Sequence, residues 1–175
     1  MSGHFISVYD PTIEELFKTS IAVDGEVVSL EIMDIAGLYC YDTNTFIHIR
    51  NSDGYIIVYS ITSKTSLFEA NRFREQLYCV LEKDPTEHIP IALVGNKCDL
   101  ESERQVPTEE AKQLAEEWNV LFFETSAKDN INITETFQAL AKDIKDHKPQ
   151  DNVVLPLQSG QERTPHTKTK KCVLF

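Results

Sequence analysis

The sequence has few of the features that assign a chain to a specialised class of protein. None of its 175 residues lies in an apolar run near the ~18 residues that a membrane-spanning helix needs, and no charged and apolar leader follows Met1. The four cysteines, Cys40, Cys79, Cys98 and Cys172, have no paired spacing, which gives little support to a zinc site or a disulfide framework. We therefore expect a cytosolic protein.

Basic charge is scarce everywhere except near the C-terminus. The chain has 17 Lys and Arg against 28 Asp and Glu, for a net charge of −11. After Gln161 there are four basic residues and one acidic residue, so this tail carries +3 and the preceding residues carry −14. An acidic body argues against binding to nucleic acid, whereas a short basic tail suits an anionic membrane surface.

Short apolar runs alternate with helical patterns along a chain of ordinary composition, 41% hydrophobic and 26% charged. Strands are expected over residues 16–23, 28–32, 55–61, 91–94 and 120–124. The first two flank Asp24-Gly25, a favoured hairpin turn. This pattern predicts an α/β domain with a mostly parallel sheet, helices on both faces and one antiparallel hairpin near the start.

Helical spacing of apolar residues marks the segments between these strands. A short helix fits residues 45–50, and Ser66 with Glu69 resembles a capping box before a helix that runs to Leu81. Thr108 and Asn132 are expected to cap two further helices. We expect a domain over residues 1–148 and a flexible, polar tail over residues 149–175.

A polar loop follows the apolar run that ends at Gly95, and it carries Asn96, Lys97 and Asp99. In an open α/β sheet, ligands bind outside the carboxyl ends of the strands. The Asp99 carboxylate can accept two N–H bonds from the edge of a guanine, which adenine does not supply, while Asn96 ties the loop and Lys97 covers the base. An ordinary polar turn explains an isolated N-K-x-D equally well.

Four motifs in order decide between these interpretations: YDPTIE, DIAGL, GNKCDL and ETSAK, followed by a C-terminal CVLF. With them the chain resembles a Ras-family small GTPase of the Ras and Rap branch over nearly its whole length. The resemblance implies the P-loop NTPase type of fold, GTP or GDP with Mg²⁺ as ligands, and a switch in membrane-associated signal transduction.

The resemblance also assigns roles to residues in these motifs. Phe5 would stack on the guanine, Thr12 and Asp34 would hold Mg²⁺, and the Gly37 N–H would contact the γ-phosphate. Guanine would be recognised by Asn96, Lys97 and Asp99. That site would be supported by Ser126, Ala127 and Lys128. The alternative for Thr12 is an exposed loop residue without a ligand.

A partner surface is expected around the first strand. The resemblance assigns an effector loop to Tyr9, Asp10, Pro11, Thr12, Ile13 and Glu14. Effector domains could add a strand to the free edge at residues 16–21, and exchange factors and GTPase-activating proteins are implied as further partners. The alternative is an ordinary edge strand protected by Glu14, Glu15 and Lys18.

The last four residues, Cys172 to Phe175, form a C-a-a-X box whose Phe favours geranylgeranylation of Cys172. One lipid binds a membrane weakly, so Lys168, Lys170 and Lys171 would add about 1 kcal/mol each. This predicts a location at the cytoplasmic face of a membrane, with the plasma membrane as the expected one. An inert terminal cysteine is the alternative.

The phosphate-binding loop of the family, G-x-x-x-x-G-K-[ST], is not found in the sequence. Eight residues precede Tyr9, and no Gly is followed by Lys. Loss of about five charge-assisted hydrogen bonds would weaken GTP binding by ~10 kcal/mol. We expect the first strand, a central one, to be missing, either through an incomplete or alternative start or because the protein is a nucleotide-free adaptor at a membrane.

Leu38 is a second departure, because the family has at this position the glutamine that orients the attacking water. Leucine cannot hydrogen-bond water, so we expect GTP hydrolysis to be slow even in a longer form. Ile35 replaces the family threonine in the same motif.

Overall fold

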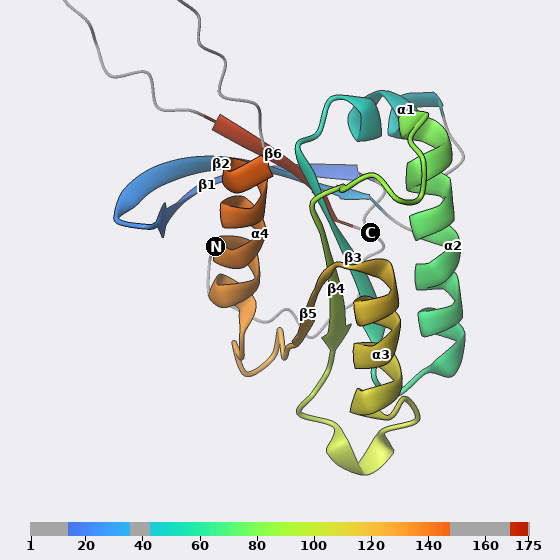
Figure 1. The fold of residues 1–175 in the computed structure, drawn as a ribbon. Helices are drawn as coiled ribbons and strands as arrows, with labels where there is room; N and C mark the ends of the chain where they lie inside the picture. The colour runs from blue at the N-terminus through green and yellow to red at the C-terminus, as the bar shows by residue number, and fades with distance from the viewer. Residues whose placement is uncertain (1–13, 36–42, 148–168, 175) are drawn as a thin grey trace, which may run out of the picture.

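The computed structural model describes residues 14–35, 43–147 and 169–174 (Figure 1). These form a six-stranded sheet in the order β1-β2-β6-β3-β4-β5, in which every neighbouring pair is parallel except β1 with β2. The strands are β1 Glu14–Val23, β2 Glu26–Ile35, β3 Gly54–Ser60, β4 Ile91–Asn96, β5 Leu121–Glu124 and β6 Thr169–Leu174. The predicted α/β sheet with one antiparallel hairpin is confirmed.

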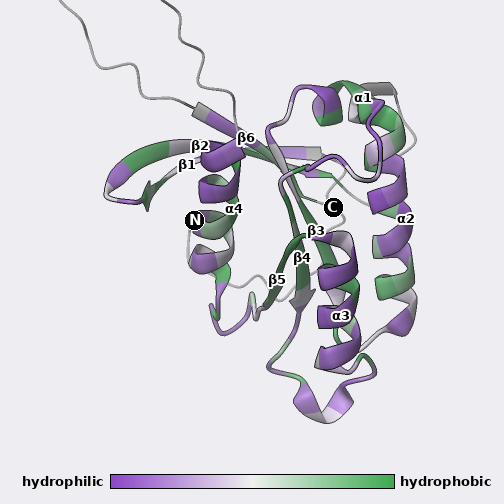
Figure 2. Ribbon diagram, viewed as in Figure 1, coloured by the Kyte–Doolittle hydropathy of each residue, from purple (hydrophilic) through white to green (hydrophobic). Residues whose placement is uncertain are grey.

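Helices cover both faces of the sheet. The helices are α1 Thr43–Arg50, α2 Lys64–Leu81, α3 Thr108–Trp118 and α4 Ile133–His147, with a short 3-10 turn, η2, at Glu101–Glu103. Residues of α1, α2 and α3 share one buried cluster with the sheet, and those of α4 share a second cluster on the opposite face. The apolar parts of β3 and β4 are green in Figure 2, and both strands are buried over most of their length, as expected for strands that are covered on both sides.

The turn between β1 and β2 has the predicted geometry. Asp24 and Gly25 both have positive φ angles, 50° and 80°, as a two-residue type I′ turn requires. Val23 consequently pairs with Glu26, and the register continues to Glu14 opposite Ile35. The hairpin leaves β1 at the edge of the sheet.

The helices predicted from periodicity are confirmed, but two of their predicted caps are wrong. Helix α2 is capped by Ser63, whose side chain accepts a hydrogen bond from the Ser66 N–H at 3.3 Å. Ser66 lies inside the first turn, where its hydroxyl accepts from the Ser60 N–H at 2.9 Å. Helix α3 begins at Thr108 with Pro107 at the cap position. Both serines fit the capping pattern, and only tertiary contact with β3 distinguishes them.

Strand β6 differs from the expectation for the tail. Residues 169–174 form a strand that lies between β2 and β3 (Figure 1, red). The unpaired backbone expected beside a missing central strand is therefore paired with the C-terminal segment. A run of four apolar residues after two lysines is too short to be recognised as a strand, because its burial depends on partners far away in the sequence. Within the described ranges, no helix is long and apolar enough to cross a membrane.

Candidate functional site

The predicted site residues lie near or just after the ends of β2, β4 and β5. These strands run in the same direction. Asn96 ends β4 next to Ser60, the last residue of β3, and Glu124 ends β5 opposite Gly95. The loops after these strands therefore leave from one edge of the sheet, where ligands bind in open α/β folds.

Asn96 ties the loop after β4 to the loop after β5. Its Oδ1 accepts hydrogen bonds from the Lys97 N–H at 2.8 Å and from the Ala127 N–H at 3.2 Å. The Thr125 hydroxyl adds a longer bond of 3.4 Å to the same oxygen. Lys97 is exposed and has a φ of 67°, a left-handed conformation that turns the chain sharply after the strand. Asn96 therefore links the two loops through its side-chain oxygen.

Asp99 lies at the centre of this pair of loops. Its side chain is 10% exposed, its Oδ1 accepts a 2.7 Å hydrogen bond from the Ser126 hydroxyl, and its Oδ2 is 3.9 Å from the Lys128 ammonium. Ser126 is fully buried and also accepts from the Asp129 N–H at 3.0 Å, which fixes the direction of its donated bond. The second loop therefore orients one oxygen of Asp99, and the described residues offer no close donor to the other.

Arg104 stabilises the loops after β4 and β5. It forms two hydrogen bonds with the Glu124 carboxylate, of 2.7 and 2.9 Å, and a further ion pair with Glu101. The two glutamates, Glu101 first, hold the pKa of Arg104 above its ordinary value. The Thr108 hydroxyl also donates to Glu124 at 3.0 Å. Nothing in the sequence pattern pointed to Arg104, because its partner lies 20 residues away and on another element.

Gly95 is required by close packing against β3. A Cβ at this position would lie 2.5 Å from the Tyr59 hydroxyl oxygen and 2.8 Å from its Cζ atom. Among the described residues that hydroxyl has no hydrogen-bond partner, and burial raises the pKa of Tyr59. The glycine of the GNKCDL motif therefore has a structural role that the spacing of the motif did not reveal.

Asp34, the predicted Mg²⁺ residue, is the last residue but one of β2 and pairs with Leu174 of β6. Burial, with a smaller contribution from the Glu15 carboxylate, raises the pKa of Asp34. The oxygens of this carboxylate are suitable Mg²⁺ ligands. The residue fits a site for a hard cation.

Several predicted site residues fall outside the described residues. These are Phe5, Tyr9, Asp10, Pro11, Thr12, Ile13, Gly37 and Leu38. Glu14, the last residue of the predicted effector loop, is the first residue of β1. Cys172, the predicted lipidation site, is 2% exposed within β6.

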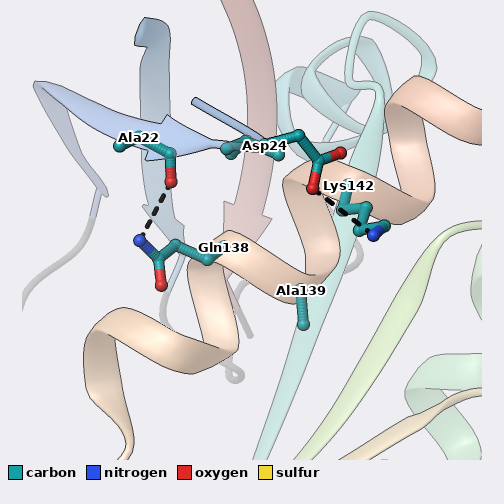
Figure 3. Close-up of a pocket in the computed structure, with 6 residues that line it drawn as sticks. Ala22, Asp24, Gln138, Ala139 and Lys142 are labelled. Atoms are coloured by element: carbon teal, nitrogen blue, oxygen red, sulfur yellow. Dashed lines mark hydrogen bonds and ion pairs between the residues drawn. The ribbon is translucent and has the colours of Figure 1, made fainter. Parts of the chain in front are cut away.

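Two further features lie away from these loops. A hollow of about 290 Å³ lies between the tip of the β1–β2 hairpin and α4, where Gln138 donates to the Ala22 carbonyl at 2.9 Å and Lys142 pairs with Asp24 at 3.4 Å (Figure 3). His88, in the segment before β4, contacts the Asp143 carboxylate of α4 at 3.1 Å, and His147 contacts the same carboxylate from within α4 at 2.8 Å. Both features fasten α4 to neighbouring elements.

Comparison with known proteins gives one consistent family. The model of the Ras family matches residues 1–146. The chain is 42% identical over 141 residues to Ras-like protein 2 of Mucor circinelloides f. lusitanicus, covering 81% of this chain and 70% of that protein. It is 40% identical over 145 residues to a Ras-like protein of Laccaria bicolor, covering 83% and 68%. The chain therefore belongs to the Ras family of small GTPases.

Proposed function

We propose that this chain is a guanine-nucleotide-dependent molecular switch that reads the base through the loops after β4 and β5. Ras-family proteins in general bind guanine nucleotides with Mg²⁺. The observation that carries the proposal for this chain is the Asp99 carboxylate, which is nearly buried and oriented by the Ser126 hydroxyl at 2.7 Å. A carboxylate so enclosed gains most from a ligand that donates hydrogen bonds.

Guanine supplies those donors and adenine does not. The N1–H and the exocyclic amino group of guanine point in the same direction and match the two oxygens of a carboxylate, whereas N1 of adenine is an acceptor and would be repelled. Lys97, exposed next to this site, can cover one face of the base with its alkyl stem. Asn96 acts indirectly by holding Ala127 and Thr125 in place.

The assignment of residues that would bind the phosphates and Mg²⁺ is based on the resemblance to the family and on Asp34. Mg²⁺, when bound, would neutralise charge on the phosphates, and Asp34 and Thr12 are the residues that would hold it. Asp34 supports this assignment by its position near the end of β2 and by its carboxylate oxygens, which suit Mg²⁺. Gly37 would contact the γ-phosphate through its N–H, and Phe5 would stack on the base.

Leu38 makes hydrolysis slow in this proposal, because an aliphatic side chain cannot orient the attacking water. The switch is then biased toward its GTP-bound state. Single-turnover hydrolysis, measured on a form of the protein that contains a phosphate-binding loop, should be faster in Leu38→Gln. Equal rates in the two proteins would refute this part of the proposal.

The experiment that tests base recognition is the analysis of nucleotide released on denaturation from a purified form of the protein that contains a phosphate-binding loop, because loss of this loop would weaken GTP binding by ~10 kcal/mol. We expect guanine nucleotide, and none from Asp99→Ala. As the matched control, Asp129→Ala removes a carboxylate from the same pair of loops, where Asp129 is exposed, and should retain the nucleotide. Release of adenine nucleotide, or equal guanine content in Asp99→Ala, would contradict the proposal.

A nucleotide-free adaptor at a membrane is the second candidate function. It is favoured by β6, which pairs with β2 and β3 and completes the sheet without a bound ligand. Edge strand β1 exposes half of Leu16 and 46% of Phe17, which suits an effector domain that adds a strand. A folded chain without nucleotide that still binds such a domain would favour the adaptor. In both candidates, lipidated Cys172 and the basic tail would provide the membrane contact while residues 169–174 are outside the sheet.

A further inference from the structure

The sheet contains a binding site for one extended segment, bounded by β2 and β3. Its occupant, β6, pairs with β2 at six positions, from Ser29 with Thr169 to Asp34 with Leu174, and with β3 at three positions. Asp53 extends the contact before β3, since its N–H donates to the Lys171 carbonyl at 2.7 Å and its Oδ2 accepts from the Lys171 N–H at 3.0 Å. The backbone of the occupant is thus bonded along both edges.

The site also buries the side chains of its occupant on both faces. Cys172 is 2% exposed and belongs to the cluster beneath α4, where Ile32 of β2 is its partner in register. Val173 is fully buried in the cluster on the opposite face. Burial raises the pKa of the Cys172 thiol to about 12, with a smaller contribution from Asp53, so the reactive thiolate is suppressed. Lys170 and Lys171 lie in the first half of β6, and the side chain of Lys171 is about half exposed.

We propose that the site between β2 and β3 binds the chain's own residues 169–174, and that this binding and lipidation of Cys172 exclude each other. The second half of this inference rests on the proposed lipidation. The tail is then either a strand of the sheet or a membrane anchor. The 21 residues between His147 and Thr169 can span about 70 Å when extended, which is enough for both positions.

The chemistry of lipidation requires the tail to leave the sheet. The Cys172 sulfur must attack C1 of an isoprenoid diphosphate, so that a C–S bond forms, the C–O bond to the diphosphate breaks, the diphosphate leaves with the electron pair and the thiol proton passes to solvent. A sulfur that is buried beneath α4 cannot approach that carbon. The enzyme that catalyses this transfer also has to reach the last four residues, of which Cys172, Val173 and Leu174 lie within β6.

Cross-linking tests the occupant of the site without disturbing it. In a chain with Cys40, Cys79 and Cys98 replaced by Ser, Ile32→Cys places a second thiol opposite Cys172, and neighbouring strands lie within disulfide distance. We expect a disulfide within one chain under mild oxidation. Val28→Cys is the matched control, since Val28 packs against the same cluster but precedes the β6 register, and it should not cross-link.

The outcomes of this experiment separate the possible occupants. A disulfide between two chains would show that a second copy supplies the strand and would overturn an intramolecular site. No disulfide, or equal cross-linking of Val28→Cys, would show that residues 169–174 do not occupy the site. Cys172 as the only cysteine should also react with a maleimide about 100-fold more slowly in the folded chain than in denaturant. Equal rates would overturn the proposal.

Lipidation tests the exclusion itself. Lys171→Pro removes the N–H that Asp53 accepts and leaves the last four residues unchanged, whereas Lys168→Pro makes the same change of residue and charge before β6 begins. With a geranylgeranyltransferase and geranylgeranyl diphosphate, we expect modification of Cys172 to be at least about tenfold faster in Lys171→Pro than in the wild type and Lys168→Pro. Equal rates in all three would overturn the exclusion.

A peptide of residues 165–175 separates the failure of this inference from the failure of the proposed lipidation. It cannot enter the sheet of its own chain, so it should be modified at least as fast as Lys171→Pro. An unmodified peptide would remove the lipid and overturn the exclusion, while the disulfide would still report the position of β6. A modified peptide without the disulfide would leave lipidation intact and overturn the strand site.

Discussion

The loops after β4 and β5 and the strand site around β6 are held in place by different means. The loops follow β4 and β5, whose neighbouring strands β3 and β4 are largely buried. Asn96, Ser126 and Arg104 connect the two loops through hydrogen bonds of 2.7 to 3.2 Å. Strand β6 reaches its position across 21 intervening residues and pairs with β3 at only three positions. A site built from such loops is preformed, whereas a short strand on a long connection can exchange.

The largest expected effect is a change of base specificity in the loops. In Asp99→Asn, one acceptor of the carboxylate becomes an N–H donor, so guanine loses about two charge-assisted hydrogen bonds, or ~3–5 kcal/mol of binding free energy. Xanthine, which has a carbonyl where guanine has its amino group, should bind this variant better than guanine does. Titration with the two nucleoside diphosphates measures the exchange, and an unchanged preference would break the account of the loops.

Removal of Arg104 should have the next largest effect. Arg104→Met leaves the Glu124 carboxylate, 19% exposed, without its bidentate partner, and should lower the free energy of unfolding by about 2 kcal/mol. Urea unfolding measures this change. Glu101→Gln is the matched control, because Glu101 is 69% exposed and its ion pair with Arg104 lies in solvent. Equal losses of unfolding free energy in Arg104→Met and Glu101→Gln would argue against a stabilising role of Arg104 at these loops.

Gly95→Ala should destabilise the edge of β4 by about 1–3 kcal/mol through overpacking against Tyr59. Tyr59→Phe alone should be neutral or stabilising by up to ~1 kcal/mol, because its buried hydroxyl has no partner among the described residues. In the double variant the hydroxyl is gone, so the cost of Gly95→Ala should fall. A double-mutant cycle from urea unfolding checks the coupling, and strict additivity would contradict it.

The smallest effect is a pH dependence from Asp34. Because its pKa in the folded chain is raised, the folded state binds this proton more tightly than the unfolded state does. The stability from this group is present below the unfolded pKa and is lost as the pH rises through the folded pKa. In the absence of Mg²⁺, Asp34→Asn should therefore gain stability over the wild type as the pH rises in this window. A difference that shrinks with rising pH would reverse the sign.

Local patterns predicted much of the fold and part of the site. The Asp24-Gly25 turn, the helical periods of α2 to α4 and the apolar run of β4 each depend on residues close in sequence. The motifs in order also directed attention to Asn96 and Ser126, which the structure places in the two loops. Arg104 and β6 could not be predicted in this way, because each depends on partners brought near by folding, such as Glu124 for Arg104.

Hydrogen exchange of the intact chain, with and without GDP and Mg²⁺, tests most directly whether the loops after β4 and β5 form the base-binding site. We expect nucleotide to slow the hydrogen exchange of the amides in residues 95–100 and 125–131. In Asp99→Ala the same addition should leave these amides unchanged, while β4 itself stays protected. Protection that develops elsewhere, or equally in wild type and Asp99→Ala, would contradict the account.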